Sequence, residues 1–229
     1  MKQTQASQDR LNQAECWVFD LDNTLYPASC DLFAQVDRKM TAYIADFLDI
    51  DFERAGEIRT TYYRDHGTTM SGMMALHDMD PSDFLDCVHD IDLSPVSPDP
   101  VLSQALSRLS GRKIIFTNGP TDHAERVLDR LSIRHHFEAI FDIIGADYIP
   151  KPRPGPYDVL VDRFRLTPEK TVMVEDLVRN LKPAAALGMT TVWVRSDSAL
   201  NAQGPGGDVH HVVDDLPRWL GALTSQEAK

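Results

Sequence analysis

The fold of this chain is decided by the stretch Cys16-Trp17-Val18-Phe19-Asp20-Leu21-Asp22-Asn23-Thr24-Leu25-Tyr26-Pro27. A short apolar run, rich in aromatic and β-branched residues, ends in two carboxylates and a polar turn. The run lacks helical spacing, so it predicts a buried strand. Because side chains alternate along a strand, Asp20 and Asp22 should point the same way beyond its C-terminal end. Open α/β sheets bind their ligands at that end.

The carboxylates of Asp20 and Asp22 repel each other, and a divalent cation beside them would offset that cost. Hard oxygen ligands with no histidine or cysteine nearby favour Mg²⁺. A solvated pair of aspartates in a turn is the plainer alternative. The position of the pair, directly after a strand of core character, favours the metal site.

The bulk composition indicates an ordinary globular protein. The chain has 229 residues, of which 42% are hydrophobic and 25% charged, which suits one α/β domain with an insertion. A net charge of −12 argues against binding to nucleic acid polymers or to membranes. Three widely spaced cysteines suggest neither disulfides nor zinc. Residues 1–14 are expected to be a polar tail without the apolar core of a signal peptide, which predicts a cytoplasmic protein.

Residues 29–92 carry helical patterns and no strand signal. Apolar side chains recur at spacings of three and four over residues 32–47, and further helices are predicted over 52–66, 71–77 and 81–88. Residues 94–100 contain three prolines, which break helices, and are expected to be the return linker. We therefore predict a small all-helical domain, residues 29–92, inserted after the first strand.

From residue 100 onward, helices and strands alternate. Strands are predicted at 113–117, 139–144, 171–175, 190–194 and 210–213, separated by helices of about ten residues. This alternation indicates a Rossmann-like, mainly parallel sheet with helices on both faces. Residues 15–28 and 93–229 would together form this α/β core.

Two polar clusters follow further strands of the predicted sheet. Thr117-Asn118-Gly119 opens a helix, and its hydroxyl and backbone N–H groups could receive an anion, although a simple N-cap explains it as well. Lys151 stands between two prolines that restrict the backbone and could hold one cation in place; an exposed loop lysine is the alternative.

A third cluster, Glu175-Asp176, ends the most β-branched strand, and Asn180 follows one helical turn later. Two acids at the end of a buried strand again suggest a metal, while Asp176 could instead cap the next helix. Together the clusters would place an oxygen cage, hydrogen-bond donors and a lysine around one crevice.

The order of these motifs resembles the haloacid dehalogenase-like (HAD) hydrolase superfamily over about residues 16–195. The four motifs of that superfamily match, in order, Asp20-Leu21-Asp22-Asn23-Thr24, Thr117-Asn118, Lys151, and Glu175-Asp176 with Asn180. The insertion point is similar to that of members with a helical C1-type cap, which makes residues 29–92 the expected cap.

A narrower likeness concerns the pyrimidine 5′-nucleotidase subfamily. The matching segments are residues 19–26, Tyr62-Tyr63-Arg64 with Gly67, and Thr117-Asn118-Gly119. The chain departs from that subfamily at Glu175, where a second Asp is common, so Asp176 is the better metal ligand.

The resemblance implies Mg²⁺-dependent hydrolysis of a phosphomonoester through an aspartyl-phosphate. Asp20 would attack phosphorus, and the Asp22 side chain would act as general acid and then as general base. Thr117, the backbone amide of Asn118 and Lys151 would bind the phosphoryl oxygens. The expected metal ligands are Asp20, the backbone carbonyl of Asp22, and Asp176, with Glu175 orienting the bound waters and Asn180 acting behind them.

The substrate would be a small phosphorylated metabolite, and the narrower likeness suggests a pyrimidine nucleoside 5′-monophosphate. Contacts to its leaving group are expected from the cap, with the candidates Tyr62, Tyr63, His66 and Met70, although packing is the alternative for each. Sugar phosphates or phosphoglycolate are alternative substrates, and a phosphomutase would share every motif. The chain is expected to be a monomer or a homodimer.

Two other functions are less consistent with the sequence. A haloacid dehalogenase would use the same nucleophile but needs no metal and no second acid, so the presence of Asp22 and Asp176 argues against it. A non-catalytic binding protein on the same scaffold would be expected to have lost a motif residue, and none is lost.

Overall fold

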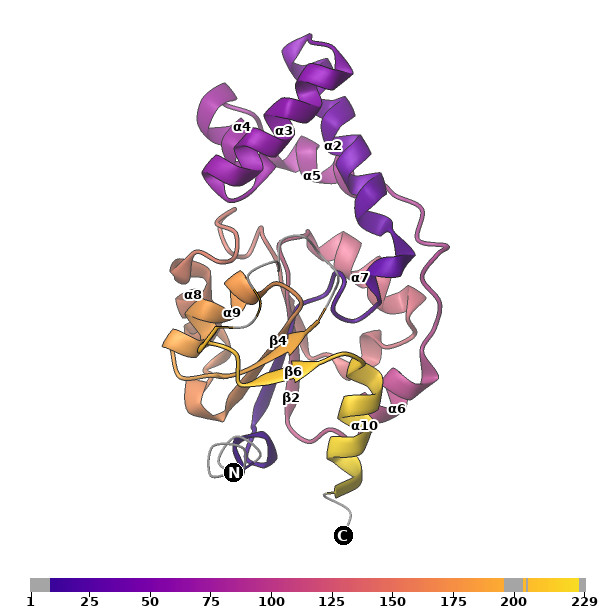
Figure 1. The fold of residues 1–229 in the computed structure, drawn as a ribbon, viewed down its shortest axis with the longest axis vertical. Coiled ribbons are helices and arrows are strands. Elements are labelled where there is room, and N and C mark those ends of the chain that lie inside the picture. Colours follow the sequence, from indigo (N-terminus) through magenta and orange to yellow (C-terminus); the bar gives the residue numbers. More distant parts are fainter. Residues whose placement is uncertain (1–8, 196–203, 205, 227–229) are drawn as a thin grey trace.

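A six-stranded sheet lies at the centre of the computed structural model, which describes residues 9–195, 204 and 206–226 (Figure 1). Every pair of neighbouring strands is parallel, in the order β3-β2-β1-β4-β5-β6. The strands are β1 (Cys16–Phe19), β2 (Arg112–Phe116), β3 (Ala139–Phe141), β4 (Thr171–Glu175), β5 (Thr190–Val194) and β6 (His211–Val213). The predicted α/β fold with a parallel sheet is confirmed, and residues 16–19 form β1, an inner strand of that sheet.

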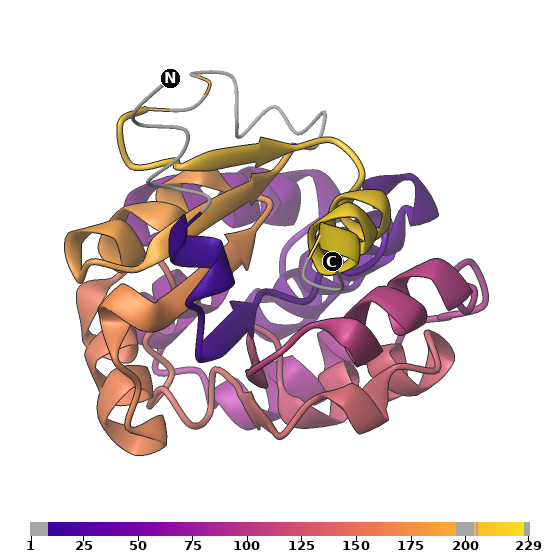
Figure 2. The same cartoon turned by 90° about the horizontal axis from the view of Figure 1, so that it is seen from below.

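Helices cover both faces of the sheet, as the view from below shows (Figure 2). Side chains of β1 alternate between the two faces. Trp17 and Phe19 belong to one apolar cluster with the helices α6 (Pro100–Arg108), α7 (Thr121–Arg130) and α10 (Leu216–Gln226). Cys16 and Val18 belong to the other, with the helices α8 (Pro154–Phe164) and α9 (Val178–Ala186). Because β1 is buried on both faces, its sequence is a continuous apolar run rather than an alternation of apolar and polar residues.

Between β1 and α6 the chain forms four α-helices that lie above the C-terminal edge of the sheet (Figure 1). They are α2 (Leu32–Leu48), α3 (Phe52–His66), α4 (Thr69–His77) and α5 (Pro81–His89). Side-chain caps begin three of them: Asp51 accepts from the backbone N–H of Arg54, Thr68 from that of Ser71, and Asp80 from that of Ser82. Helix α2 packs against α3 and α5, and α3 packs against α4. We call α2–α5 the helical block.

Short elements connect the larger ones. Three 3₁₀ helices, η1 (Ala28–Cys30), η2 (Arg134–His136) and η3 (Pro168–Lys170), lie in loops of the chain. Strand β3 is shorter than predicted because Asp142, directly after it, turns the chain. Its carboxylate accepts from the backbone N–H and hydroxyl of Thr121 and from the backbone N–H of Gly145. No helix among the described residues has both the length and the apolarity needed to cross a membrane.

The polar tail expected over residues 1–14 is described only in part, since residues 1–8 lie outside the described ranges. Residues 9–12 are helical, and Leu11 is buried in the apolar cluster that contains Trp17. The backbone N–H of Glu15 then donates to the Lys170 carbonyl oxygen, 2.8 Å away. The structure therefore differs from the expectation, because one leucine in a polar segment packs on the sheet.

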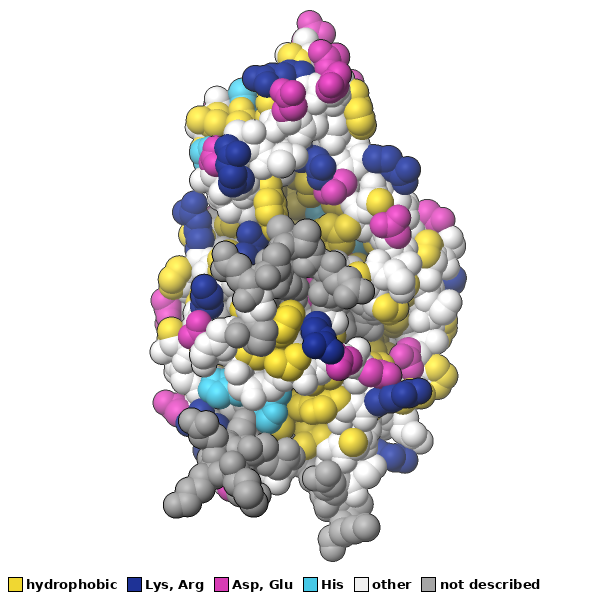
Figure 3. All heavy atoms as spheres, viewed as in Figure 1, with side chains coloured by type: hydrophobic (Ala, Val, Ile, Leu, Met, Phe, Trp, Pro, Cys, Tyr) yellow, Lys and Arg dark blue, Asp and Glu magenta, His cyan; other side chains and the backbone are white. Residues whose placement is uncertain are grey.

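Charged side chains of both signs are interspersed over the face of the molecule in Figure 3. The basic residues visible there form no continuous stripe, and the acidic residues outnumber the basic ones in the chain as a whole, 35 to 23. This face therefore offers no extended positive surface of the kind that binds a nucleic acid backbone.

Candidate active site

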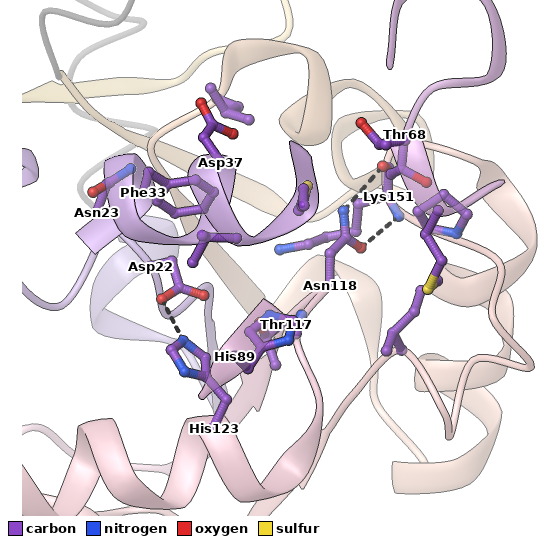
Figure 4. Close-up of a pocket in the computed structure, with 18 of the residues that line it drawn as sticks. Asp22, Asn23, Phe33, Asp37, Thr68, His89, Thr117, Asn118, His123 and Lys151 are labelled. Atoms are coloured by element: carbon purple, nitrogen blue, oxygen red, sulfur yellow. Dashed lines mark hydrogen bonds and ion pairs between the residues drawn. The ribbon is translucent and has the colours of Figure 1, made fainter. Parts of the chain in front are cut away.

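A cavity of about 510 Å³ lies between the helical block and the C-terminal edge of the sheet. The segments after β1, β2 and β4 contribute many of its polar lining residues, and α2, α3, α4 and α5 contribute most of its apolar lining together with polar side chains such as Asp37 and Arg59. Figure 4 shows side chains from both parts, among them Phe33 from α2 and Lys151 from the loop before α8. Parallel strands bring their carboxyl ends to one edge, so motifs far apart in the sequence meet here.

Asp20 follows β1 directly and is 6% exposed. Its backbone N–H donates to the Val174 carbonyl oxygen of β4, which continues the sheet pairing by one residue. One carboxylate oxygen accepts from Lys151 Nζ at 2.7 Å, and the other accepts from Thr24 Oγ1 at 2.7 Å. Each oxygen thus has a donor, and the side chain is held at the cavity wall.

Two further carboxylates, Glu175 and Asp176, follow at the end of β4. One oxygen from each of Asp20, Glu175 and Asp176 can be chosen so that all three lie within 4.8 Å of one another, and all three residues are buried. Burial, and then the charge of Glu175, raises the pKa of both Asp20 and Asp176 well above the ordinary range. One lysine cannot offset three ionised carboxylates, so the cluster fits a divalent cation with oxygen ligands, as Mg²⁺ requires.

The side chain of Lys151 is 1% exposed, and its ammonium group donates to three acceptors. These are Asp20 Oδ1 at 2.7 Å, Glu175 Oε1 at 3.0 Å and the Phe116 carbonyl oxygen at 2.7 Å. Burial by itself lowers the pKa of Lys151, but the charges of the two carboxylates outweigh burial and raise it. An ammonium group has three N–H donors, so all of them are engaged. A phosphoryl oxygen could accept a hydrogen bond from Lys151 only if one of these N–H groups left a carboxylate.

Thr117 and Asn118 follow β2. The backbone N–H of Gly119 donates to Thr117 Oγ1 at 3.0 Å. The Asn118 side chain makes two hydrogen bonds with the backbone of Lys151, which Figure 4 shows as dashed lines: Lys151 N–H donates to Oδ1 at 2.8 Å, and Nδ2 donates to the carbonyl oxygen at 3.3 Å. The side chain of Asn118 therefore holds the lysine loop, in which the Lys151–Pro152 bond is cis. Because its side chain is engaged in this way, the group of Asn118 that would contact a substrate is its backbone N–H.

Asp22 also lines the cavity, but its carboxylate has partners of its own. The strand ends at Phe19, and the segment that follows it brings both Asp20 and Asp22 to the cavity. Asp22 Oδ1 accepts from the Tyr26 hydroxyl at 2.6 Å and from His123 Nε2 at 2.9 Å. Burial raises the pKa of Asp22, but the charge and hydrogen bond of His123, with the Tyr26 bond, hold it below its ordinary value.

Glu175 is held at both oxygens. Asn180 Nδ2 donates to Oε1 at 2.6 Å, and the backbone N–H of Leu177 donates to Oε2 at 2.7 Å. Asn180 is itself fixed by α8, since the Tyr157 hydroxyl donates to its carbonyl oxygen at 2.6 Å. Asn180 therefore holds Glu175 in the acidic cluster, which is the role expected of a residue that orients metal ligands without binding the metal.

The four candidates from the helical block divide into two pairs. Tyr63 and Met70 line the cavity. Tyr62 and His66 are not among the lining residues: the Tyr62 hydroxyl contacts His77 Nε2 at 2.6 Å, and its ring packs against α4, where a Cβ on Gly72 would lie 2.5 Å from that of Tyr62. Adjacent helix positions point about 100° apart, so one tyrosine faces the cavity while its neighbour packs between α3 and α4.

Several lining residues have no expected role from the sequence. Tyr26 and His123 bind Asp22, His89 packs on His123 with ring centroids 4.8 Å apart, and Arg179 donates to the Tyr63 hydroxyl. One signal was available for His123, since it shares the buried face of α7 with Ala124, Val127 and Leu128. A histidine on an otherwise apolar helix face needs a polar partner, but the sequence does not show which one.

Comparisons with known proteins agree with this geometry. A model of the haloacid dehalogenase-like hydrolase family matches residues 15–188. The chain is similar to a glyceraldehyde 3-phosphate phosphatase of Methanocaldococcus jannaschii, with 30% identity over 194 residues that cover 77% of this chain and 83% of the relative.

Solved structures show the same fold at lower identity. A HAD phosphatase from Thermococcus onnurineus matches with a TM-score of 0.62 and 18% identity, covering 91% of this chain and 97% of that one. The L-2-haloacid dehalogenase from Xanthobacter autotrophicus matches with a TM-score of 0.57 and 17% identity, covering 91% and 98%. Because one is a phosphatase and the other a dehalogenase, the fold alone does not select the reaction.

Proposed function

Since this chain belongs to the haloacid dehalogenase-like hydrolase family, we propose that it hydrolyses phosphomonoesters with Mg²⁺, through an aspartyl-phosphate on Asp20. One observation carries the proposal. The Asp20 carboxylate lies at the wall of the cavity, 2.7 Å from Lys151 Nζ and within a cluster of three buried carboxylates. A dehalogenase needs a nucleophile but no such cluster, and the second acid, Asp22, also lines the cavity.

The acidic cluster would hold the metal through Asp20 and Asp176, with the backbone carbonyl of Asp22 as a further ligand and Glu175 orienting its waters. Bound Mg²⁺ would supply charge neutralisation, so that a carboxylate and a phosphate can approach each other in line. Around it, Asn180 and Leu177 fix Glu175, and Thr24 and Lys151 fix Asp20. These hydrogen bonds keep the carboxylates in place before a substrate arrives.

In the first step an Asp20 oxygen forms a bond to phosphorus and the ester P–O bond breaks. The leaving oxygen takes a proton from Asp22, which becomes a carboxylate. As negative charge moves from Asp20 onto the phosphoryl group, the N–H of Lys151 that now binds Asp20 Oδ1 becomes available to a phosphoryl oxygen. Thr117 and the backbone N–H of Asn118 would donate to the others.

In the second step Asp22 takes a proton from water, and the water oxygen bonds to phosphorus. The acyl-phosphate bond breaks, which releases inorganic phosphate and restores the Asp20 carboxylate. The second step thus returns to Asp22 the proton that the first step removed, so a single carboxyl serves both transfers.

Residues 29–92 would be a C1-type cap on a core of residues 15–28 and 93–229. The helical block supplies apolar and aromatic side chains to the cavity, including Phe33, Tyr63 and Met70, which suit a flat base. Tyr63 lines the cavity, and Arg179 lies over its ring, 4.8 Å from the centroid. We therefore infer a pyrimidine nucleoside 5′-monophosphate as substrate. The similarity to a glyceraldehyde 3-phosphate phosphatase favours sugar phosphates as the alternative.

Removal of Mg²⁺ is expected to abolish turnover of p-nitrophenyl phosphate, and added Mg²⁺ should restore it. The metal should also raise the midpoint of thermal unfolding, because it binds the folded protein and relieves repulsion among three buried carboxylates. Activity in the presence of EDTA and differential scanning fluorimetry check both parts. Full activity in EDTA, with no effect of Mg²⁺ on the unfolding midpoint, would contradict the metal site.

The substrate class can be tested with a panel of UMP, CMP, glyceraldehyde 3-phosphate, other sugar phosphates and phosphoglycolate. We expect the highest kcat/KM for UMP and CMP, measured as release of inorganic phosphate. Equal or higher values for the sugar phosphates would reject the nucleotide assignment and support the alternative. Release of phosphate, rather than an isomeric phosphate ester, separates a phosphatase from a phosphomutase.

Within the same panel, Tyr63→Ala should raise KM for UMP about tenfold, the usual cost of losing a base-stacking aromatic side chain. Tyr62→Phe is the matched control, because Tyr62 packs against α4 outside the lining of the cavity, and it should leave KM unchanged. If the two variants had equal effects on KM, Tyr63 would not be the contact.

A further inference from the structure

Asp22 is the proposed acid and base, and its carboxylate is anchored on one side only. The Tyr26 hydroxyl, at 2.6 Å, and His123 Nε2, at 2.9 Å, both donate to Oδ1. No described residue makes a hydrogen bond to Oδ2. Figure 4 shows the His123 contact and places Asp22 beside the cavity that also receives Thr117 and Lys151.

Among the described residues, His123 makes a hydrogen bond only to Asp22. It is 2% exposed, and its Nδ1 has no hydrogen-bond partner among the described residues. Placing an imidazole on the apolar face of α7 costs free energy unless it is hydrogen-bonded. The one hydrogen bond it makes joins the helix after the second motif to an acid of the first, 101 positions earlier in the chain.

The surroundings also fix the ring of His123. His89, the last residue of α5, packs on it with ring centroids 4.8 Å apart. Its Cδ2 faces Gly119, where an added Cβ would lie 3.3 Å away. His89 is itself oriented by a hydrogen bond to the Leu85 carbonyl oxygen, 2.9 Å from Nδ1. An imidazole packed between two elements cannot rotate away from Asp22 without moving them.

We propose that His123, with Tyr26, is a positioning residue for acid–base catalysis: they hold Oδ1 of Asp22, so that Oδ2 carries the proton to the leaving oxygen. This inference rests on the proposed phosphatase function. The transfer itself is the one given above, in which the leaving oxygen gains the proton that Oδ2 loses. Two donors on Oδ1 make protonation there unfavourable, because an O–H would face two N–H or O–H groups.

The dependence on the leaving group tests this role. The value of kcat/KM reports only the steps up to formation of the aspartyl-phosphate, in which Asp22 acts as acid. p-Nitrophenolate leaves as a stable anion and hardly needs a proton, whereas phenolate from phenyl phosphate does. We expect His123→Leu to lower kcat/KM for phenyl phosphate at least about tenfold, and that for p-nitrophenyl phosphate by less than about threefold.

Two further variants separate positioning from general damage. His123→Gln can place an N–H near the position of Nε2 and should recover much of the rate with phenyl phosphate. Tyr26→Phe keeps the buried ring, removes the other donor to Oδ1 and should show the same selective loss. His136→Leu is the matched control, since His136 contacts Ser103 rather than Asp22, and it should leave the ratio of the two kcat/KM values unchanged.

The outcomes distinguish this inference from the function on which it rests. Equal losses on both substrates in folded His123→Leu and Tyr26→Phe, or no loss on either, would overturn the positioning role while leaving the phosphatase intact. Wild-type protein that hydrolyses neither ester with Mg²⁺ would instead reject the phosphatase function, and the inference with it. Circular dichroism and the unfolding midpoint show which variants are folded.

Discussion

Replacing Asp20 by asparagine is expected to lower turnover on the order of 10⁴-fold or more, because an amide cannot form the proposed covalent bond to phosphorus. The same change is not expected to unfold the protein. Burial and the charge of Glu175 already disfavour the ionised form of Asp20, so a neutral side chain of nearly the same shape relieves repulsion in the cluster. Lys151 keeps Glu175 Oε1 and the Phe116 carbonyl oxygen as acceptors.

The measurement pairs kcat for p-nitrophenyl phosphate with thermal unfolding of Asp20→Asn and the wild type. Thr24→Val is a useful companion, because it removes the hydrogen bond to Asp20 Oδ2 while leaving the carboxylate, and it should reduce the rate without abolishing it. An Asp20→Asn variant that turns over at the wild-type rate would contradict the assignment of the nucleophile.

Replacing Lys151 by methionine should both inactivate and destabilise the protein. The ammonium group is the cation that lies among Asp20, Glu175 and the end of β2, and removing one partner of a buried ion pair typically costs about 3–5 kcal/mol of folding free energy. Loss of a positioned donor to the phosphoryl group should lower kcat by about 10²–10³-fold or more. Both effects have the same cause: the carboxylates of Asp20 and Glu175 would lose the positive charge that balances them.

The destabilisation of Lys151→Met should depend on pH. The pKa of Asp20 in the folded protein already lies above its unfolded value, and losing the lysine raises it further. A carboxyl group whose folded pKa is raised lowers stability as pH rises from the unfolded value through the folded one. The variant should therefore be closer to wild type in stability at acidic than at neutral pH, without Mg²⁺, as urea unfolding at the two pH values measures.

Lys113→Met is the matched control for Lys151→Met. Lys113 is also buried, but its ammonium group donates to the carbonyl oxygens of Leu109 and Gly111, which precede β2, whereas the cavity lies beyond the C-terminal end of that strand. It should keep kcat near the wild-type value. If Lys151→Met were as active as this control, Lys151 would have no role in the reaction.

Much of the fold followed from local patterns in the sequence. The apolar run at residues 16–19, the alternation of strands and helices after residue 100, and the prolines near residue 95 predict the sheet and the site of the insertion. Strand-end chemistry predicted the meeting of Asp20, Lys151 and Glu175, because parallel strands align their carboxyl ends. These features depend on patterns that span only a few neighbouring residues, and such patterns are visible in a single sequence.

The sequence did not predict contacts that depend on where a side chain points, or on residues far apart in the chain. Tyr62 and Tyr63 are neighbours of the same residue type on α3, so the sequence does not distinguish them. In the structure Tyr63 lines the cavity, whereas Tyr62 packs against α4. The Asn118 side chain binds the lysine loop 33 positions later. His123 acts on Asp22 across 101 positions. Each contact is set by how elements pack together, which local periodicity does not specify.

The covalent intermediate is the most direct test of the account. Asp22→Asn protein, in which removal of the proposed base slows the second step, is mixed with p-nitrophenyl phosphate and Mg²⁺ and quenched in acid. We predict a phosphorylated peptide that contains Asp20, and borohydride reduction of the trapped adduct should convert Asp20 to homoserine. Phosphate found on another residue, or p-nitrophenol released with no phosphorylated protein at any quench time, would contradict it.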